Sequence, residues 1–196
     1  MKKQLKKAAA ALLVGASLFA FQGEAFASIH NVNKGDTLWK ISTQYGVPIS
    51  EVLMLNNLNS HLIYPGQSIK LPATITQAEK NLLAQLVHAE AKGEPYAGKV
   101  AVATVVLNRV DSPDFPDSIK EVIYQISNGY YAFTPVANGE INRPANSEAM
   151  KAVNEALAFR GKGKGSLFFY NPQTSTSKWI LSREVTTVIG KHRFAK

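Results

Sequence analysis

Apolar positions recur at helical spacing over much of the chain, and this pattern predicts a mainly helical protein. The clearest run follows Thr76 and Glu79, which have the spacing of a capping box at the start of a helix. The apolar face of this helix is formed by Leu82, Leu83, Leu86 and Val87. Residues 96–110 are apolar on all sides, as in a buried helix or a buried strand, and their length and alanine content favour a helix.

One acidic residue interrupts the apolar face of the first helix. Glu90 follows Leu86 by four positions and therefore faces the same way, and a Gly-Glu-Pro bend at 93–95 ends the helix. Burial and the negative end of a helix both raise the pKa of a carboxyl group, and a general acid must hold its proton near neutral pH. The pattern leaves two interpretations open: a general acid, or a buried glutamate satisfied by Arg109 or Lys92.

The rest of the C-terminal part predicts one more long helix and a small hairpin. Residues 147–159 have helical periodicity. Asn-Gly pairs at 128–129 and 138–139 bracket an aromatic-rich segment, which predicts an extended loop or hairpin. Residues 167–170 and 178–181 are predicted as the two strands of a small β-hairpin.

Residues 28–72 predict a smaller unit with a different organisation. A short alternating segment at 29–32 precedes a helix that begins after Thr37, and a second amphipathic run begins at Ile49. A strand at 68–72 closes the unit. The order strand–helix–helix–strand leaves a very small core, which is typical of a binding module rather than of an enzyme.

The first 27 residues have the organisation of a secretory signal peptide. Four lysines precede an apolar run from Ala8 to Phe21, and small residues follow in Ala25-Phe26-Ala27. A bilayer span needs roughly 20 apolar residues, so this run is short for a permanent anchor. We expect export with cleavage after Ala27 and no integral membrane contact afterwards.

The composition of the chain excludes several kinds of catalytic and metal-binding site. The 196 residues carry 22 Lys and Arg against 14 Asp and Glu, a net charge of +8, and they include no cysteine. A thiol nucleophile, a disulfide framework and a cysteine-ligated metal are therefore excluded. The four histidines lack H-x-x-x-H spacing, so no metal or other cofactor is expected. An exported chain with a net positive charge is expected to be attracted to the anionic polymers of a cell wall. The sequence contains no basic arm or basic helix face that would indicate nucleic-acid binding.

Three motifs cover residues 28–72. They are Val32-x-Lys34-Gly35-Asp36-Thr37-Leu38-Trp39-x-Ile41, Ile49-x-x-Val52-x-x-Leu55-Asn56 and Tyr64-Pro65-Gly66-Gln67-x-Ile69-x-Leu71-Pro72. They resemble the LysM family, a peptidoglycan- and chitin-binding module. The resemblance implies a shallow groove for N-acetylglucosamine-containing sugar, with Gly35, Asp36, Thr37 and Leu38 on one wall and Asn59, Leu62 and Ile63 on the other. Asp36 and Thr37 are also candidates for helix capping, and Trp39 is predicted in the core rather than as a sugar platform.

A second set of motifs spans residues 76–196. It comprises Ala89-Glu90-Ala91-Lys92-Gly93-Glu94-Pro95-Tyr96-x-Gly98-x-Val100-Ala101-Val102-Ala103, Val106-Leu107-Asn108-Arg109, Phe133-Thr134-Pro135-Val136, Phe169-Tyr170-Asn171-Pro172, Ser177-Lys178-Trp179 and Ile189-Gly190-Lys191-His192-x-Phe194. These motifs resemble the SleB/CwlJ cell-wall hydrolase family, whose best-known members act on the cortex of bacterial spores. The resemblance implies a lysozyme-like, α-rich fold and a catalytic glutamate at Glu90, with Glu94 as the alternative. Lys92 stands where the family commonly has arginine.

The resemblance also implies lytic transglycosylase chemistry. One carboxylic acid protonates the glycosidic oxygen and then deprotonates the sugar's own 6-hydroxyl, so no enzyme nucleophile is needed. A hydrolase would need two carboxyls, about 5 Å apart if retaining and about 6.5–9.5 Å apart if inverting. With Glu94 as the second carboxyl, ordinary muramidase action stays open. The candidate substrate-binding residues are Asn108, Phe133, Thr134, Tyr170, Asn171, Lys178 and Trp179, and the alternative role of the polar ones is turn capping.

The sequence thus predicts an α+β protein in three segments. Residues 1–27 are a signal peptide, 28–72 a small βααβ LysM domain, and 73–196 a lysozyme-like, mainly α-helical catalytic domain with a small β-hairpin. We expect a secreted, wall- or spore-associated monomer whose partner is the glycan strand of peptidoglycan. The alternatives are an N-acetylmuramoyl-L-alanine amidase and a non-catalytic wall-binding protein.

Overall fold

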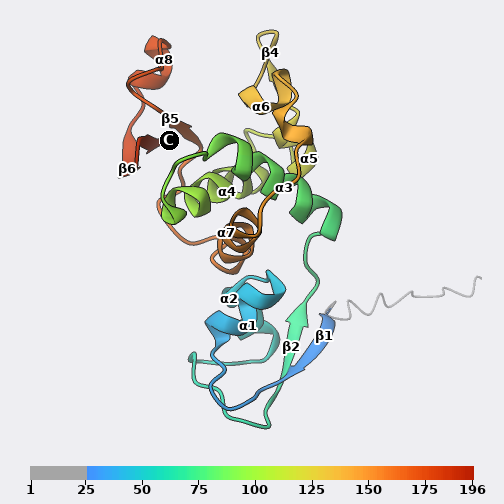
Figure 1. Ribbon diagram of the computed structural model, residues 1–196. Coiled ribbons are helices and arrows are strands. Elements are labelled where there is room, and N and C mark those ends of the chain that lie inside the picture. The colour runs from blue at the N-terminus through green and yellow to red at the C-terminus, as the bar shows by residue number, and fades with distance from the viewer. Residues whose placement is uncertain (1–25) are drawn as a thin grey trace, which may run out of the picture.

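The computed structural model describes residues 26–196, which form two units stacked along one long axis (Figure 1). We call residues 26–72 the N-terminal unit and residues 73–196 the C-terminal unit. The basic and apolar parts of the predicted leader lie outside the described residues. Within residues 26–196, no helix combines the length and the apolar character needed to span a bilayer.

The N-terminal unit has the predicted order of elements. Its strands β1 (Phe26–Asn31) and β2 (Ser68–Pro72) pair in antiparallel register, and the helices α1 (Leu38–Tyr45) and α2 (Ile49–Leu55) lie between them in the chain. Side chains from all parts of the unit share one small core, formed by Val32, Leu38, Ile41, Val47, Val52, Ile69 and Leu71. Strand–helix–helix–strand is therefore confirmed.

The C-terminal unit is built on three packed helices. They are α3 (Gln77–Glu90), α4 (Tyr96–Val110) and α7 (Ser147–Ala158), with the shorter α5 (Ile119–Ile123) packed against α3 and α4. The capping box of Thr76 and Glu79 is confirmed, since each side chain bonds the other's backbone amide. The apolar segment 96–110 is a helix whose buried positions join the main core.

The first Asn-Gly pair makes the predicted hairpin, and the second does not. Strands β3 (Ile126–Ser127) and β4 (Tyr130–Tyr131) pair across Asn128-Gly129, whose φ angles of 52° and 82° suit a tight hairpin turn. The chain then forms the short helix α6 (Thr134–Ala137) and the 3₁₀ turn η1 (Glu140–Asn142). Gly139 therefore starts a helical turn instead of closing a hairpin.

The sheet of the C-terminal unit differs from the predicted hairpin. Strand β5 (Phe168–Tyr170) is present, but its partner is β7 (His192–Ala195), which also pairs with β6 (Val185–Ile189). The predicted second strand, 178–181, is the short helix α8 (Lys178–Leu181). The Ser177 hydroxyl accepts a hydrogen bond from the Ile180 amide and caps this turn, a local bond that competes with strand pairing.

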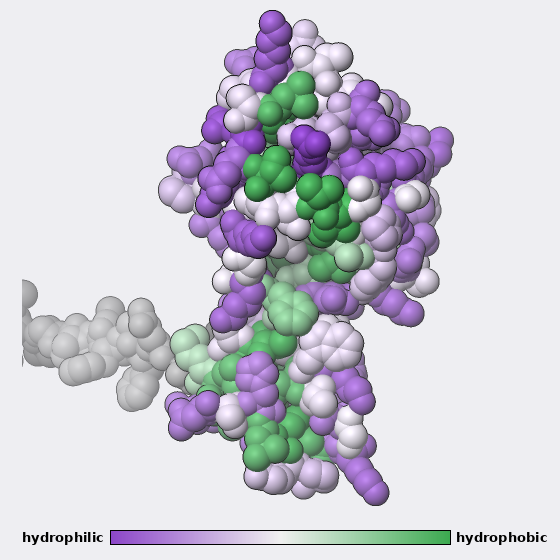
Figure 2. All heavy atoms as spheres, turned by 90° about the vertical axis from the view of Figure 1, so that its left-hand side faces the viewer, coloured by the Kyte–Doolittle hydropathy of each residue, from purple (hydrophilic) through white to green (hydrophobic). Residues whose placement is uncertain are grey.

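Hydrogen bonds fasten the two units together at the end of α1. The Lys80 ammonium of α3 donates to the Tyr45 carbonyl at 2.7 Å, and the Thr74 hydroxyl donates to the Gly46 carbonyl at 2.7 Å. Gly46 has a φ of 64°, and a Cβ there would lie 2.8 Å from the Lys80 nitrogen, so the junction requires glycine. Figure 2 shows the junction as a narrow waist between a broad upper and a smaller lower unit.

Candidate active site

A polar cavity of about 290 Å³ lies where the end of α3 meets α6, β5 and β7. These elements gather at the end of the C-terminal unit that is remote from the N-terminal unit (Figure 1). The lining residues are Glu90, Arg109, Ala132, Phe133, Thr134, Phe169, Tyr170, Asn171, Thr174 and His192. Segments separated by about half the chain therefore form one site.

Glu90 is the last residue of α3 and holds the one carboxylate among the described residues that line this cavity. Burial raises the pKa of its carboxyl from 4.5 to about 7, and the nearby charge of Glu140 adds to the rise. A hydrogen bond with the Thr134 backbone and the charge of Arg109 oppose it. A carboxyl with this pKa is about half protonated at neutral pH.

Neither cation that could have neutralised Glu90 forms an ion pair with it. Lys92 instead pairs with Glu140, at 3.0 Å between Nζ and Oε2. Arg109 directs its Nε toward the Leu167 carbonyl, to which it donates at 2.7 Å. No ion pair of Glu90 occurs within residues 26–196. Of the two interpretations of the pattern, the structure therefore favours the proton-holding carboxyl.

Arg109 is held in place by aromatic rings. Its guanidinium carbon lies 5.0 Å from the ring centroids of both Phe115 and Phe133 and 5.4 Å from that of Phe168. Burial lowers the pKa of Arg109 to about 10, so the group stays cationic at neutral pH. It thus supplies a fixed positive charge near Glu90 without bonding to it.

Four of the seven candidate substrate-binding residues join Glu90 in the cavity, namely Phe133, Thr134, Tyr170 and Asn171. Two polar atoms of lining residues, the Tyr170 hydroxyl and His192 Nδ1, are buried and have no hydrogen-bond partner in the described part of the chain. Buried polar atoms are rarely left unpaired, and the exceptions often occur at functional sites.

The other three candidates lie elsewhere. Asn108 donates from Nδ2 to the Ser166 carbonyl at 2.9 Å and lines a separate hollow under the 161–165 loop. Lys178 and Trp179 belong to α8, which is not part of the cavity wall. The Trp179 ring is half exposed and makes an edge contact with Phe168 at 5.0 Å.

Glu94, the alternative acid, does not line the cavity either. Its side chain is buried, and its Oε2 accepts a hydrogen bond from the Lys191 amide at 3.0 Å, in the turn between β6 and β7. The charge of Glu94 nevertheless affects the pKa of His192, which lines the cavity. Burial lowers the pKa of the His192 ring, and the charge of Glu94 opposes that change.

The sequence pattern alone did not single out His192 or Thr174 as members of the site. His192 lies in β7, a strand that the pattern did not predict, and reaches the cavity because β7 pairs with β5. The motif Ile189-Gly190-Lys191-His192 was the available signal, because it belongs to the family resemblance. Within residues 26–196, no cluster of three or more histidine or acidic side chains is placed to hold a metal ion.

The two predicted walls of the sugar groove start from the same end of the N-terminal sheet. Val32 exchanges backbone hydrogen bonds with Gly66 and Gln67, so the segment after β1 begins beside the turn before β2. Both segments lie toward the end of the molecule away from α7 (Figure 1). Leu62 is 62% exposed, but Leu38 is fully buried in the core, so only the Leu38 backbone can meet a ligand.

The other wall residues have varied environments. Gly35 and Asn59 are exposed, whereas Ile63 packs partly against the core. The Asp36 carboxylate accepts a hydrogen bond from the Asn33 amide at 2.8 Å and lies 3.0 Å from His30 Nε2, and these bonds lower its pKa. The Thr37 hydroxyl accepts from the first turn of α1 and is therefore the helix cap.

Comparison with known proteins gives a match for each unit. Residues 93–195 match the family described as Cell Wall Hydrolase, and residues 30–72 match the LysM domain. Glu90 lies just before the first of these segments, so its assignment rests on the geometry above.

The chain is also similar to spore cortex-lytic enzymes. It is 43% identical to that of Halalkalibacterium halodurans over 65% of this chain and 38% of the relative, and 42% identical to that of Bacillus subtilis over 64% and 40%. The chain therefore spans about two fifths of the length of these curated relatives. Among solved structures, the catalytic domain of the germination-specific lytic transglycosylase SleB from Bacillus anthracis matches 64% of this chain and 99% of its own, with 42% identity and a TM-score of 0.57.

Proposed function

The chain belongs to the cell wall hydrolase family, and on that premise we propose that it cleaves the glycan strand of peptidoglycan as a lytic transglycosylase with Glu90 as its single acid and base. The observation that carries the proposal is the half-buried Glu90 carboxyl, which forms no ion pair within the described chain, faces a polar cavity and has a pKa raised to about 7.

The chemistry needs one carboxyl in two protonation states. Protonated Glu90 gives its proton to the oxygen between N-acetylmuramic acid and N-acetylglucosamine as the bond to the anomeric carbon breaks. The resulting carboxylate then takes the proton of the muramic acid 6-hydroxyl, whose oxygen attacks the same anomeric carbon. The products are a 1,6-anhydro end and a free 4-hydroxyl, and Glu90 ends protonated as it began.

The absence of a second carboxylate from the described cavity wall supports transglycosylation over hydrolysis. A retaining or inverting hydrolase uses two carboxyls facing one sugar. Glu94, the other candidate, is held by the Lys191 amide and lies outside the wall. In the cavity, Thr134, Asn171 and the Tyr170 hydroxyl supply hydrogen-bonding groups for the sugar around the breaking bond.

The N-terminal unit would hold the same polymer. We infer that its groove, formed by Gly35, Asp36, Thr37, the Leu38 backbone, Asn59, Leu62 and Ile63, binds N-acetylglucosamine-containing strands. Export through the 1–27 leader would deliver a monomeric protein to the cell wall or spore envelope. The LysM match and the similarity to spore cortex-lytic enzymes support this location.

Mass spectrometry of digested peptidoglycan tests the proposal. The full chain without its leader should release fragments with anhydromuramic ends. The substitution Glu90→Gln should lower the rate by about 100-fold or more, because an amide cannot transfer the proton. Glu184→Gln, which alters an exposed carboxyl paired with Lys196, is the matched control and should leave the rate unchanged.

Other products would point to other functions. Reducing ends from the parent chain and from Glu184→Gln, with none from Glu90→Gln, would indicate a muramidase that uses the same acid. Released stem peptides would indicate an amidase, and intact wall after incubation would indicate a binding protein. Each of these results overturns the transglycosylase proposal.

A further inference from the structure

A second cleft, of about 360 Å³, lies at the junction of the two units. Trp39, Lys40, Thr43 and Gln44 of α1 form one wall, and Tyr96 of α4 with Lys151, Asn154 and Glu155 of α7 forms the other. Its volume is within the range of sites for small ligands. It shares no lining residue with the Glu90 cavity or with the predicted sugar groove.

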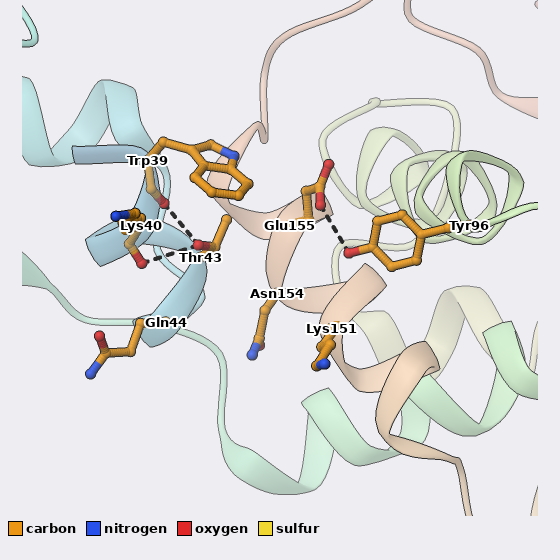
Figure 3. Close-up of a pocket in the computed structure, with 8 residues that line it drawn as sticks. All are labelled: Trp39, Lys40, Thr43, Gln44, Tyr96, Lys151, Asn154 and Glu155. Atoms are coloured by element: carbon orange, nitrogen blue, oxygen red, sulfur yellow. Dashed lines mark hydrogen bonds between the residues drawn. The ribbon is translucent and has the colours of Figure 1, made fainter. Parts of the chain in front are cut away.

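Both rings of this cleft are partly exposed to solvent. Trp39, which the sequence pattern predicts in the core, is 46% exposed, and Tyr96 is 36% exposed. Figure 3 shows the Trp39 indole directed from α1 toward α7, with the Tyr96 ring on the far side of Glu155. Indole and phenol rings combine an apolar face with a polar edge, which is the character that the C–H face of a sugar ring requires.

Polar groups of several kinds accompany the rings. The Tyr96 hydroxyl donates to Glu155 Oε2 at 2.9 Å, which fixes the orientation of both side chains (Figure 3). Asn154 Oδ1 is buried and has no hydrogen-bond partner in the described chain. Lys151 forms no ion pair within residues 26–196. An aromatic pair, an amide and a free cation together suit an N-acetylated sugar that carries a carboxylate.

We propose that this junction cleft binds a short stretch of peptidoglycan, with its sugar rings on Trp39 and Tyr96 and a carboxylate of the lactyl or stem-peptide group at Lys151. The inference rests on the proposed function for the choice of polymer. The occupant touches both units, so it would strengthen the junction while the strand is processed. The cleft would be a third contact with the polymer, between the groove and the acid.

Tryptophan fluorescence provides a direct test, because the chain has only two tryptophans. In a chain carrying Glu90→Gln and Trp179→Phe, Trp39 is the one remaining indole and no strand is cleaved. Titration with purified disaccharide-tetrapeptide fragments should give a saturable change in Trp39 emission. Adding Leu62→Asp, which alters the predicted groove, should leave that change in place. Loss of the signal on Leu62→Asp, or no signal at millimolar ligand, would overturn the proposal.

Two substitutions test the walls of the cleft. Tyr96→Ala should weaken binding about tenfold or more, and Tyr124→Ala, at a tyrosine of similar exposure outside the cleft, should not weaken it. Circular dichroism shows whether each variant is folded, and Tyr96→Phe, which keeps the ring and removes the hydrogen bond to Glu155, should weaken binding by a smaller factor. Equal affinity of Tyr96→Ala and the parent contradicts the assignment.

The carboxylate part of the proposal has its own test. Lys151→Ala should weaken the disaccharide-tetrapeptide several-fold and leave neutral chitotetraose unaffected. Equal effects on both ligands would contradict the proposed contact between Lys151 and a carboxylate of the ligand. These titrations use the inactive Glu90→Gln chain, so they measure binding without cleavage. A negative titration therefore leaves the proposed cleavage untouched, and a negative digestion leaves the proposed cleft binding untouched.

Discussion

At the scale of single residues, the environment of Glu90 opposes its ionisation. The half-buried side chain lies at the end of α3, and the guanidinium of Arg109, whose charge acts on it, is bonded elsewhere. The result is a carboxyl whose pKa of about 7 lies within the working range of a general acid. The same arrangement makes its protonation sensitive to small changes in pH.

The rate of strand cleavage should therefore fall as the pH rises through about 7. The neutral form is the one that donates the proton, and a raised pKa means that this form persists from acid pH up to about 7 and is lost above it. The measurement is the initial rate on peptidoglycan between pH 4.5 and 9, with binding measured in parallel. A rate that rises from pH 6 to pH 8 would contradict the assignment of Glu90 as the acid.

Tyr170 gives a prediction in which stability and activity change in opposite directions. Its hydroxyl is buried without a partner, so Tyr170→Phe should leave the free energy of unfolding unchanged or raise it by about 1 kcal/mol. If the hydroxyl bonds the substrate, the same substitution should lower kcat/KM about tenfold. Urea unfolding and the wall-digestion rate supply the two values. A destabilised, fully active variant would show that the hydroxyl has only a structural role.

At the scale of elements, the long helices and the strands at 68–72 and 168–170 were predictable, whereas the short run at 178–181 was not. α3 and α7 follow from spacing because each buries a face over three or more turns, and α4 was predicted from its length and alanine content. Position 90 could be placed for the same reason, since it continues an established face. Residues 178–181 form four positions of helix instead of strand, and so short a run carries too little periodicity to decide.

Site members from distant segments were less predictable. His192 enters the cavity through the pairing of β7 with β5, a contact that sequence spacing does not encode. Glu94 is directed away from the cavity wall because Gly93, at a φ of 74°, turns the chain between α3 and α4. Trp39 was predicted in the core, whereas it lines a partly exposed cleft between the two units.

Arg109 connects α4 to the start of β5, and this link can be tested. Arg109→Lys keeps the charge but loses the planar group between the Phe115 and Phe133 rings and the directed bond to the Leu167 carbonyl. We expect the free energy of unfolding to fall by about 1–3 kcal/mol, as measured in urea. Arg193→Lys, at an exposed position of β7, is the control and should change it by less than about 0.5 kcal/mol. Equal effects would contradict the link.

At the scale of the whole molecule, the proposed contacts with the polymer follow the long axis. The segments of the predicted groove lie at one end, α1 and α7 around the junction cleft lie in the middle, and the elements around the Glu90 cavity lie at the other end (Figure 1). This order depends on the units keeping their relative position. The packing of α1 against α7 and the bonds of Lys80 and Thr74 to the end of α1 provide that constraint.

Lys80→Met should loosen the junction. The substitution keeps the apolar stem but removes the ammonium that bonds the Tyr45 carbonyl, a group at a helix end without another described backbone donor. We expect the N-terminal unit to lose about 1–2 kcal/mol and to melt before the C-terminal unit, as seen by calorimetry. Lys34→Met, at an exposed loop position, is the control. One transition at the parent temperature would show that the bond does not couple the units.

Helix α3 has a consequence for where the proposed cleavage can occur. It contacts the N-terminal unit at Lys80 and ends at Glu90, and ten residues of helix advance about 15 Å. A helix of this kind fixes the distance between the junction at Lys80 and the carboxyl of Glu90. While its N-terminal unit stays bound to the polymer, such a protein would cleave only glycosidic bonds within a fixed distance of that unit. It would have to dissociate and bind again to act further along the wall.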